Sequence, residues 1–89
     1  MRERKNFMNI GVLEIDVHDM TWMRAKSYID SQLTKAKKDV YRLRVVHGYR
    51  GGTKIKEMIR KQYRNHEKVI RIEYGLNQGI TDLVLKDLF

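Results

Sequence analysis

Apolar and polar side chains alternate along residues 12–18, near the start of the chain. Every second residue of this stretch, beginning with Leu13, is apolar, and the residues between are polar or charged. A period of two indicates a β-strand with one buried face. The exposed side of this predicted strand carries Asp16 and His18.

A helical pattern follows, because the apolar residues now recur at spacings of three and four. These residues are Trp22, Ala25, Ile29, Leu33 and Ala36. The side chain of Asp19 or Thr21 can accept a hydrogen bond from the free N–H groups at the start of this helix. We expect Trp22 to anchor the core or its edge rather than to stack on a nucleobase.

The rest of the chain repeats both patterns. The elements expected are a strand at 41–47, a helix from 55 to about 66, a strand at 69–74 and a last strand at about 82–86. In the strand at 69–74, Ile70, Ile72 and Tyr74 are predicted to face inward.

The order β-α-β-α-β-β predicts an α/β fold of the two-layer sandwich type. Crossovers between parallel strands are right-handed, so both helices are expected on one face of a four-stranded mixed sheet. The other face is then open. It is expected to carry Glu14, Asp16, Arg42, Arg44, Arg71, Glu73 and Lys86.

The 89 residues are enough for one small domain. We expect a flexible basic arm at 1–11 and a folded domain at 12–89. The net charge is +8, and residues 24–68 alone hold 14 basic and four acidic side chains. Such a concentration of positive charge predicts a nucleic-acid partner, without implying sequence specificity.

Composition excludes several other classes. The chain has no cysteine, which excludes disulfides, thiolate zinc sites and cysteine nucleophiles. The charged N-terminal sequence has no apolar run typical of a signal peptide, and no stretch approaches the roughly 20 apolar residues that span a bilayer. A cytoplasmic protein that does not contact membranes is therefore expected.

Candidate chemistry gathers where the first two predicted strands end. Asp16 and His18 end one strand, and His47 ends the other. Ligands of open α/β sheets bind beyond the carboxyl ends of parallel strands. Two imidazoles there favour general acid–base catalysis on a phosphodiester, with Asp16 orienting one ring. The same three side chains are an alternative ligand set for a divalent metal such as Mg²⁺ or Mn²⁺.

A glycine-rich loop joins the second strand to the second helix. Its residues are Gly48, Tyr49, Arg50, Gly51 and Gly52. Glycines let the backbone approach a phosphate closely, and the helix that follows offers free N–H groups. Arg50 and Lys54 add positive charge, and Tyr49 is a candidate for stacking on the substrate or hydrogen bonding to it.

These motifs together resemble the Smr (small MutS-related) domain over about residues 12–89. Residues 15–19 (IDVHD) match an LDxHG-type motif, residues 47–52 (HGYRGG) match an HGxGxG-type loop, and residues 79–81 (GIT) match a late G-x-T. Asp19 and Arg50 stand where the family usually has glycine, and Ile55 is displaced by one position.

The resemblance implies a fold similar to the C-terminal domain of the third bacterial translation initiation factor. It implies endonuclease activity, as DNA nicking or RNA cleavage, with catalytic positions at Asp16, His18 and His47. It also implies substrate contacts at the glycine loop and near Gly79 and Thr81.

Three classes of function remain after the sequence is read. An endonuclease is favoured, with RNA preferred over DNA as the substrate. A non-catalytic module that binds nucleic acid or a ribosomal surface is the alternative, and a protein-binding role for the open sheet face is a third. No cofactor is required by the residues, although a divalent metal is compatible with them.

Overall fold

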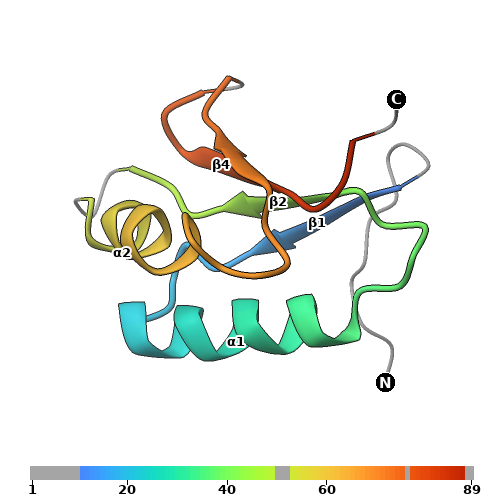
Figure 1. Ribbon diagram of the computed structural model, residues 1–89. Coiled ribbons are helices and arrows are strands. Elements are labelled where there is room, and N and C mark those ends of the chain that lie inside the picture. Colours follow the sequence, from blue (N-terminus) through green and yellow to red (C-terminus); the bar gives the residue numbers. More distant parts are fainter. Residues whose placement is uncertain (1–10, 50–52, 76, 88–89) are drawn as a thin grey trace.

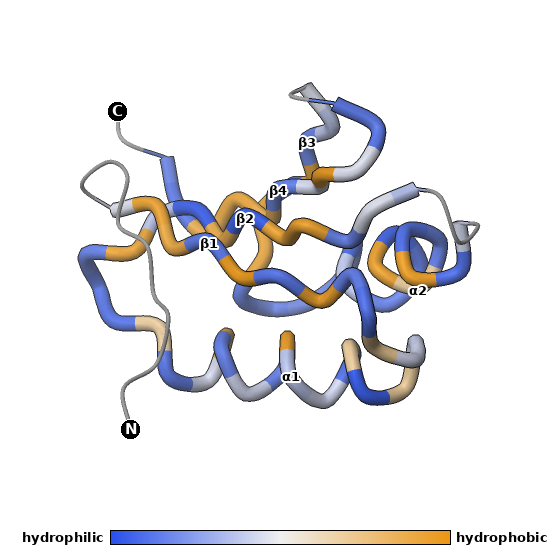
Figure 2. Tube along the Cα trace, turned by 180° about the vertical axis from the view of Figure 1, so that it is seen from behind, coloured by the Kyte–Doolittle hydropathy of each residue, from blue (hydrophilic) through white to orange (hydrophobic). Residues whose placement is uncertain are grey.

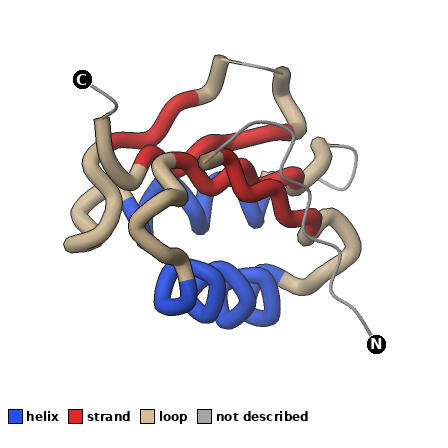
Figure 3. Tube along the Cα trace, turned by 90° about the vertical axis from the view of Figure 1, so that its right-hand side faces the viewer, coloured by secondary structure: helices blue, strands red, loops and turns tan. Residues whose placement is uncertain are grey.

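The computed structural model describes residues 11–49, 53–75 and 77–87. Within them the chain forms a sheet with two helices on one face (Figure 1). Viewed from the side, the strands make one layer and the helices a second (Figure 3). The elements are β1 (Val12–Asp16), α1 (Trp22–Lys35), β2 (Arg42–Val46), α2 (Lys54–Tyr63), β3 (Arg71–Glu73) and β4 (Ile80–Val84).

The strand order is β1-β2-β4-β3. β1 and β2 are parallel, and β4 is antiparallel to both of its neighbours. The predicted mixed sheet, element order and single helical face are thus confirmed. The last strand begins at Ile80 rather than near Asp82, because Ile80 and Thr81 already pair with the end of β2.

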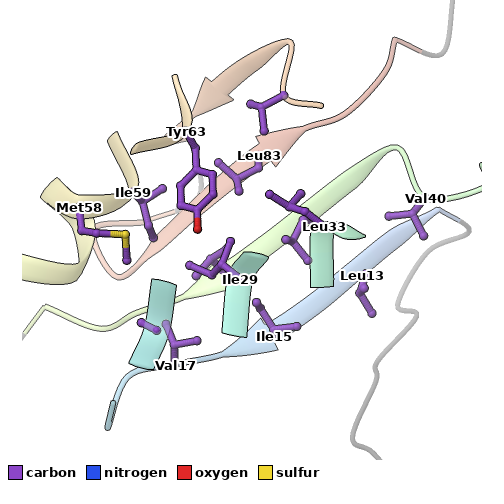
Figure 4. Close-up of a cluster of buried hydrophobic side chains, with 14 residues drawn as sticks. Leu13, Ile15, Val17, Ile29, Leu33, Val40, Met58, Ile59, Tyr63 and Leu83 are labelled. Atoms are coloured by element: carbon purple, nitrogen blue, oxygen red, sulfur yellow. The ribbon is translucent and has the colours of Figure 1, made fainter. Parts of the chain in front are cut away.

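The core lies between the sheet and the two helices (Figure 4). Leu13, Ile15 and Val17 enter it from β1 and the residue after it, and Ile29 and Leu33 enter it from α1. Apolar positions alternate with polar ones from Leu13 onward in β1 and from Arg42 to Val45 in β2 (Figure 2). The alternation read from the sequence therefore places the first two strands correctly.

Helix α1 begins where the capping residues predicted it. The hydroxyl oxygen of Thr21 accepts a hydrogen bond from the Arg24 N–H at 3.2 Å. The expectation for Trp22 was wrong, because its side chain is 45% exposed. As the first residue of the helix, Trp22 lies beyond the edge of the core and beside the ends of β1 and β2.

The edge strand β3 corrects a second expectation. Ile70 is 50% exposed and Tyr74 is 44% exposed, whereas both were predicted to face inward. The strand holds only Arg71–Glu73, so the alternation does not extend to the residues on either side. Val69 is the apolar residue of this segment that enters the core, with Ile72 packed against it.

The open face of the sheet carries charges that pair with one another. Asp82 is almost fully buried, and it accepts hydrogen bonds from Arg42 at 2.8 Å and from Arg44 at 3.1 Å. Glu73 accepts from Arg42 at 2.9 Å and from Arg71 at 2.8 Å. These partners neutralise much of the predicted mixed-charge face, which leaves less free charge for a partner there.

Candidate active site at the ends of β1 and β2

The parallel pairing of β1 and β2 places Asp16 beside Val46 in the register. The Val17 N–H continues the ladder by donating to the Val46 carbonyl at 2.8 Å. His47 directly follows Val46 and His18 lies two residues after Asp16, so both histidines leave the sheet at the same edge. Both line a hollow of about 300 Å³. The hollow is further lined by Met20, Thr21, Trp22, Gly48, Lys54, Ile55 and Lys56.

Asp16 holds His18 through two hydrogen bonds. Its Oδ1 accepts from the His18 backbone N–H at 3.0 Å and lies 2.6 Å from His18 Nδ1. The side-chain hydrogen bond to Asp16 is the main cause that raises the pKa of His18 above its ordinary value of 6.5. For Asp16, partial burial acts to raise the pKa, but the hydrogen bonds from His18 outweigh it and leave the pKa below 3.8. The Asp16 carboxylate thus orients the His18 ring and stabilises its protonated form.

The second nitrogen of His18 faces Asp19. His18 Nε2 lies 3.1 Å from Asp19 Oδ2, and the Asp19 side chain is 87% exposed. The charge of Asp19 also contributes to the raised pKa of His18. A phosphate oxygen that approaches this nitrogen must displace a like-charged carboxylate, whose exposed side chain is free to rotate away.

His47 differs from His18 in burial and in charge. Its side chain is almost fully buried, and burial is the main cause that lowers its pKa below 6.5. His47 Nδ1 lies 2.7 Å from the Gly48 carbonyl, which only accepts, so this nitrogen carries the proton. His47 Nε2 then accepts from the Thr81 hydroxyl at 2.8 Å. The environment of His47 therefore favours its neutral form.

Two glycines let the loops meet at this point. Gly48 has a φ of +74°, and a Cβ added there would lie 3.3 Å from His18 Cβ. A Cβ at Gly79 would lie 3.3 Å from Gly48 Cα. The His47 and Gly48 N–H groups both donate to the Gly79 carbonyl, at 2.8 and 3.0 Å. Gly79 thus ties the turn before β4 to the end of β2.

The other predicted substrate contacts divide into three groups. Lys54 lines the hollow, and Tyr49 is 60% exposed next to it. Thr81 is fully buried, so its contact with the site runs through His47. Arg50, Gly51 and Gly52 lie outside the described residues, as does nearly all of the predicted arm at 1–11.

Five residues that line the hollow were not predicted from the sequence as site residues: Met20, Thr21, Trp22, Ile55 and Lys56. For Trp22 the sequence did hold a signal. The residue stands four positions after His18 and directly after the helix cap, which places it near the end of the first strand. Lys56 lies in the first turn of α2 after the glycine loop, as Lys54 does.

Two negative findings apply to the residues described. In 11–49, 53–75 and 77–87, no three histidine, aspartate or glutamate side chains come close enough together to hold a metal ion. In the structure both ring nitrogens of His47 have hydrogen-bond partners in the protein, namely the Gly48 carbonyl and the Thr81 hydroxyl. None of the helices in these ranges is long and apolar enough to cross a membrane.

The hydrogen bonds of His18 lead to a first prediction. Replacing Asp16 by asparagine should lower the pKa of His18 toward 6.5, because the hydrogen-bonded carboxylate that stabilises the imidazolium is removed. Asp19→Asn should lower it less, since Asp19 acts only through its charge. An NMR titration of the three histidine rings measures both shifts, with the His66 resonance as an internal control. An unchanged His18 pKa in Asp16→Asn would contradict the pairing.

Comparisons with known proteins agree with this fold. The family model described as the Smr domain matches residues 15–80. The crystal structure of the Smr domain of Thermus thermophilus MutS2 is similar to this fold with a TM-score of 0.74 and 24% sequence identity. The alignment covers 83% of this chain and 98% of that one. No curated protein sequence matches the chain.

Proposed function

Because the chain belongs to the Smr domain family, we propose that it is an endonuclease that cleaves RNA by proton transfer at His18 and His47. The observation that supports this most strongly is that both histidines line one hollow, His18 paired with a carboxylate and His47 almost fully buried. The pKa of His18 is raised and that of His47 is lowered. Around pH 6.5 these directions favour a protonated His18 and a neutral His47. Environments that separate two pKa values in this way are typical of an acid and a base.

In this proposal a 2′-hydroxyl of the RNA attacks the adjacent phosphorus. Neutral His47 removes the 2′ proton at Nε2, after its ring has rotated away from the buried Thr81 hydroxyl and toward the hollow. Protonated His18 gives a proton to the 5′ oxygen as its bond to phosphorus breaks. The products are a 2′,3′-cyclic phosphate and a 5′-hydroxyl. Lys54 and Lys56 are proposed to hold the phosphate.

The surrounding charge supports a nucleic-acid substrate. Residues 24–68 span both helices and carry a local charge of +10. Phosphate contacts of this kind bind the backbone regardless of sequence, so the substrate is expected to be chosen by shape. A cytoplasmic RNA, including RNA exposed on a ribosome, fits the proposal.

A second candidate is nucleic-acid binding without cleavage, and Asp19 is the observation that favours it. The family's glycine at this position leaves the second nitrogen of His18 open, whereas here a carboxylate lies 3.1 Å from it. DNA nicking by an attacking water, assisted by Mg²⁺ or Mn²⁺, is the third possibility.

One assay separates these functions. The protein is incubated with RNA and DNA hairpins of matched sequence, with EDTA or with Mg²⁺ and Mn²⁺. RNA cleavage that persists in EDTA is the expected result. Cleavage of DNA that depends on the metal would replace the proposal with nicking. If both hairpins bind but neither is cut in any condition, the binding function stands instead.

A further inference from the structure

A second hollow lies next to the one that contains the histidines. Its volume is about 360 Å³, and it is lined by Thr53, Lys56, Glu57, Arg60 and Tyr74. It is formed between α2 and the residue that follows β3. Lys56 lines both hollows, so they are neighbours that share this one side chain.

Tyr74 is the unusual feature of this second hollow. Its side chain is 44% exposed, and the Lys56 ammonium lies 5.9 Å from the centroid of its ring. A tyrosine in a core or on a solvated strand would ordinarily bury more of its ring or pair across the sheet. Here the ring borders a hollow with two cations, Lys56 and Arg60.

The chemistry of this hollow suits one nucleotide. An aromatic ring offers a stacking surface to any base, and adjacent cations hold the phosphates on either side of it. Glu57 is the opposing charge, and its Oε2 accepts from the Thr53 hydroxyl at 3.1 Å. Two cations against one anion leave the hollow positive. An acidic peptide would satisfy the cations but would leave the tyrosine ring without a stacking partner.

We propose that the hollow at Tyr74 binds the base of an unpaired nucleotide beside the phosphate held near His18, with Lys56 contacting the backbone between them. This inference rests on the proposed function, since it extends the path of the same strand. It names the preferred substrate as nucleic acid with a single-stranded segment next to the scissile phosphate. A paired base cannot stack on a side chain without leaving its own helix.

Binding is measured so that cleavage is not required. The probe is a fluorescein-labelled hairpin of 2′-O-methyl RNA, with or without a single-stranded tail, and anisotropy reports the affinity. Tyr74→Ala should weaken binding of the tailed hairpin about tenfold, which is a typical loss for one stacked base. Tyr74→Phe should bind like the wild type because it keeps the ring. Binding of the blunt hairpin should hardly change in either variant.

Two controls define what would overturn the proposal. Lys56→Ala should weaken tail binding more than Lys37→Ala, which removes the same charge from an exposed position after α1. Placing an abasic site at each tail position in turn should remove the effect of Tyr74→Ala at one position only. Equal losses on tailed and blunt hairpins, or no loss on either, would overturn the proposal. A protein without any cleavage activity but with these binding results would refute the proposed function alone.

Discussion

Replacing His18 by alanine is expected to reduce RNA cleavage about a thousandfold or more while leaving RNA affinity within about threefold of the wild type. The structure gives the reason for this split. The His18 ring is exposed, so its loss creates no cavity, and its two carboxylate partners, Asp16 and Asp19, are also exposed. The phosphate contacts proposed for Lys54 and Lys56 do not depend on it. What the variant lacks is the proton for the leaving oxygen.

The experiment compares single-turnover cleavage with filter-binding affinity on the same RNA. His66→Ala is the matched control, because His66 lies after α2 and hydrogen-bonds to the Lys68 N–H. It should cleave at close to the wild-type rate once equal folding is confirmed by thermal melting. If His18→Ala retained more than about a tenth of the wild-type rate, His18 would not be the general acid.

His47 needs a different substitution. Its ring is buried and bridges Gly48 and Thr81, so alanine would leave a cavity and an unpaired hydroxyl as well as removing the base. A loss of cleavage in His47→Ala could therefore come from a destabilised fold as well as from the missing base. Glutamine is the more informative replacement, because its amide can keep a hydrogen bond to Thr81 but cannot take up a proton at neutral pH.

The fold was predictable because the sequence patterns that define it are local. The alternation that begins at Leu13 and the helical stripe of Ile29 and Leu33 both report burial within single elements. Strands that follow one another in the chain usually lie side by side, and the parallel pairing of β1 with β2 brings His18 to His47. The order of the elements therefore favoured this part of the site, and the strand pairing completes it.

The missed features depend on contacts between distant elements. Thr81 meets His47 only because β4 inserts between β2 and β3, and Asp82 is buried by two arginines of β2 for the same reason. The spacing of residues within one segment does not show how β4 pairs with β2. Tyr74 was misplaced for a related reason, because a period of two was continued past the end of a three-residue strand.

The nucleotide directly 5′ of the cleaved bond carries the 2′-hydroxyl that attacks in the proposed reaction. Replacing this one nucleotide by its 2′-deoxy form should stop cleavage at that bond altogether. In the proposed reaction the nucleophile is supplied by the substrate, and nothing in the hollow replaces it. The positive charges proposed to bind the phosphate contact the backbone, so the modified RNA should still bind. The cleaved position is first mapped on a natural RNA, and the oligonucleotide is then made with one hydroxyl missing.

The matched control moves the same deoxy substitution one nucleotide further along, where cleavage at the mapped position should continue. The unmodified product should carry a 2′,3′-cyclic phosphate, which mass spectrometry distinguishes from a linear phosphate by the mass of one water. Cutting of the deoxy substrate at the original rate would mean that water is the nucleophile. In that case His18 would still serve as the acid for the leaving oxygen, and the attacking water would need a base or a metal. The missing hydroxyl therefore tests the nucleophile separately from the acid.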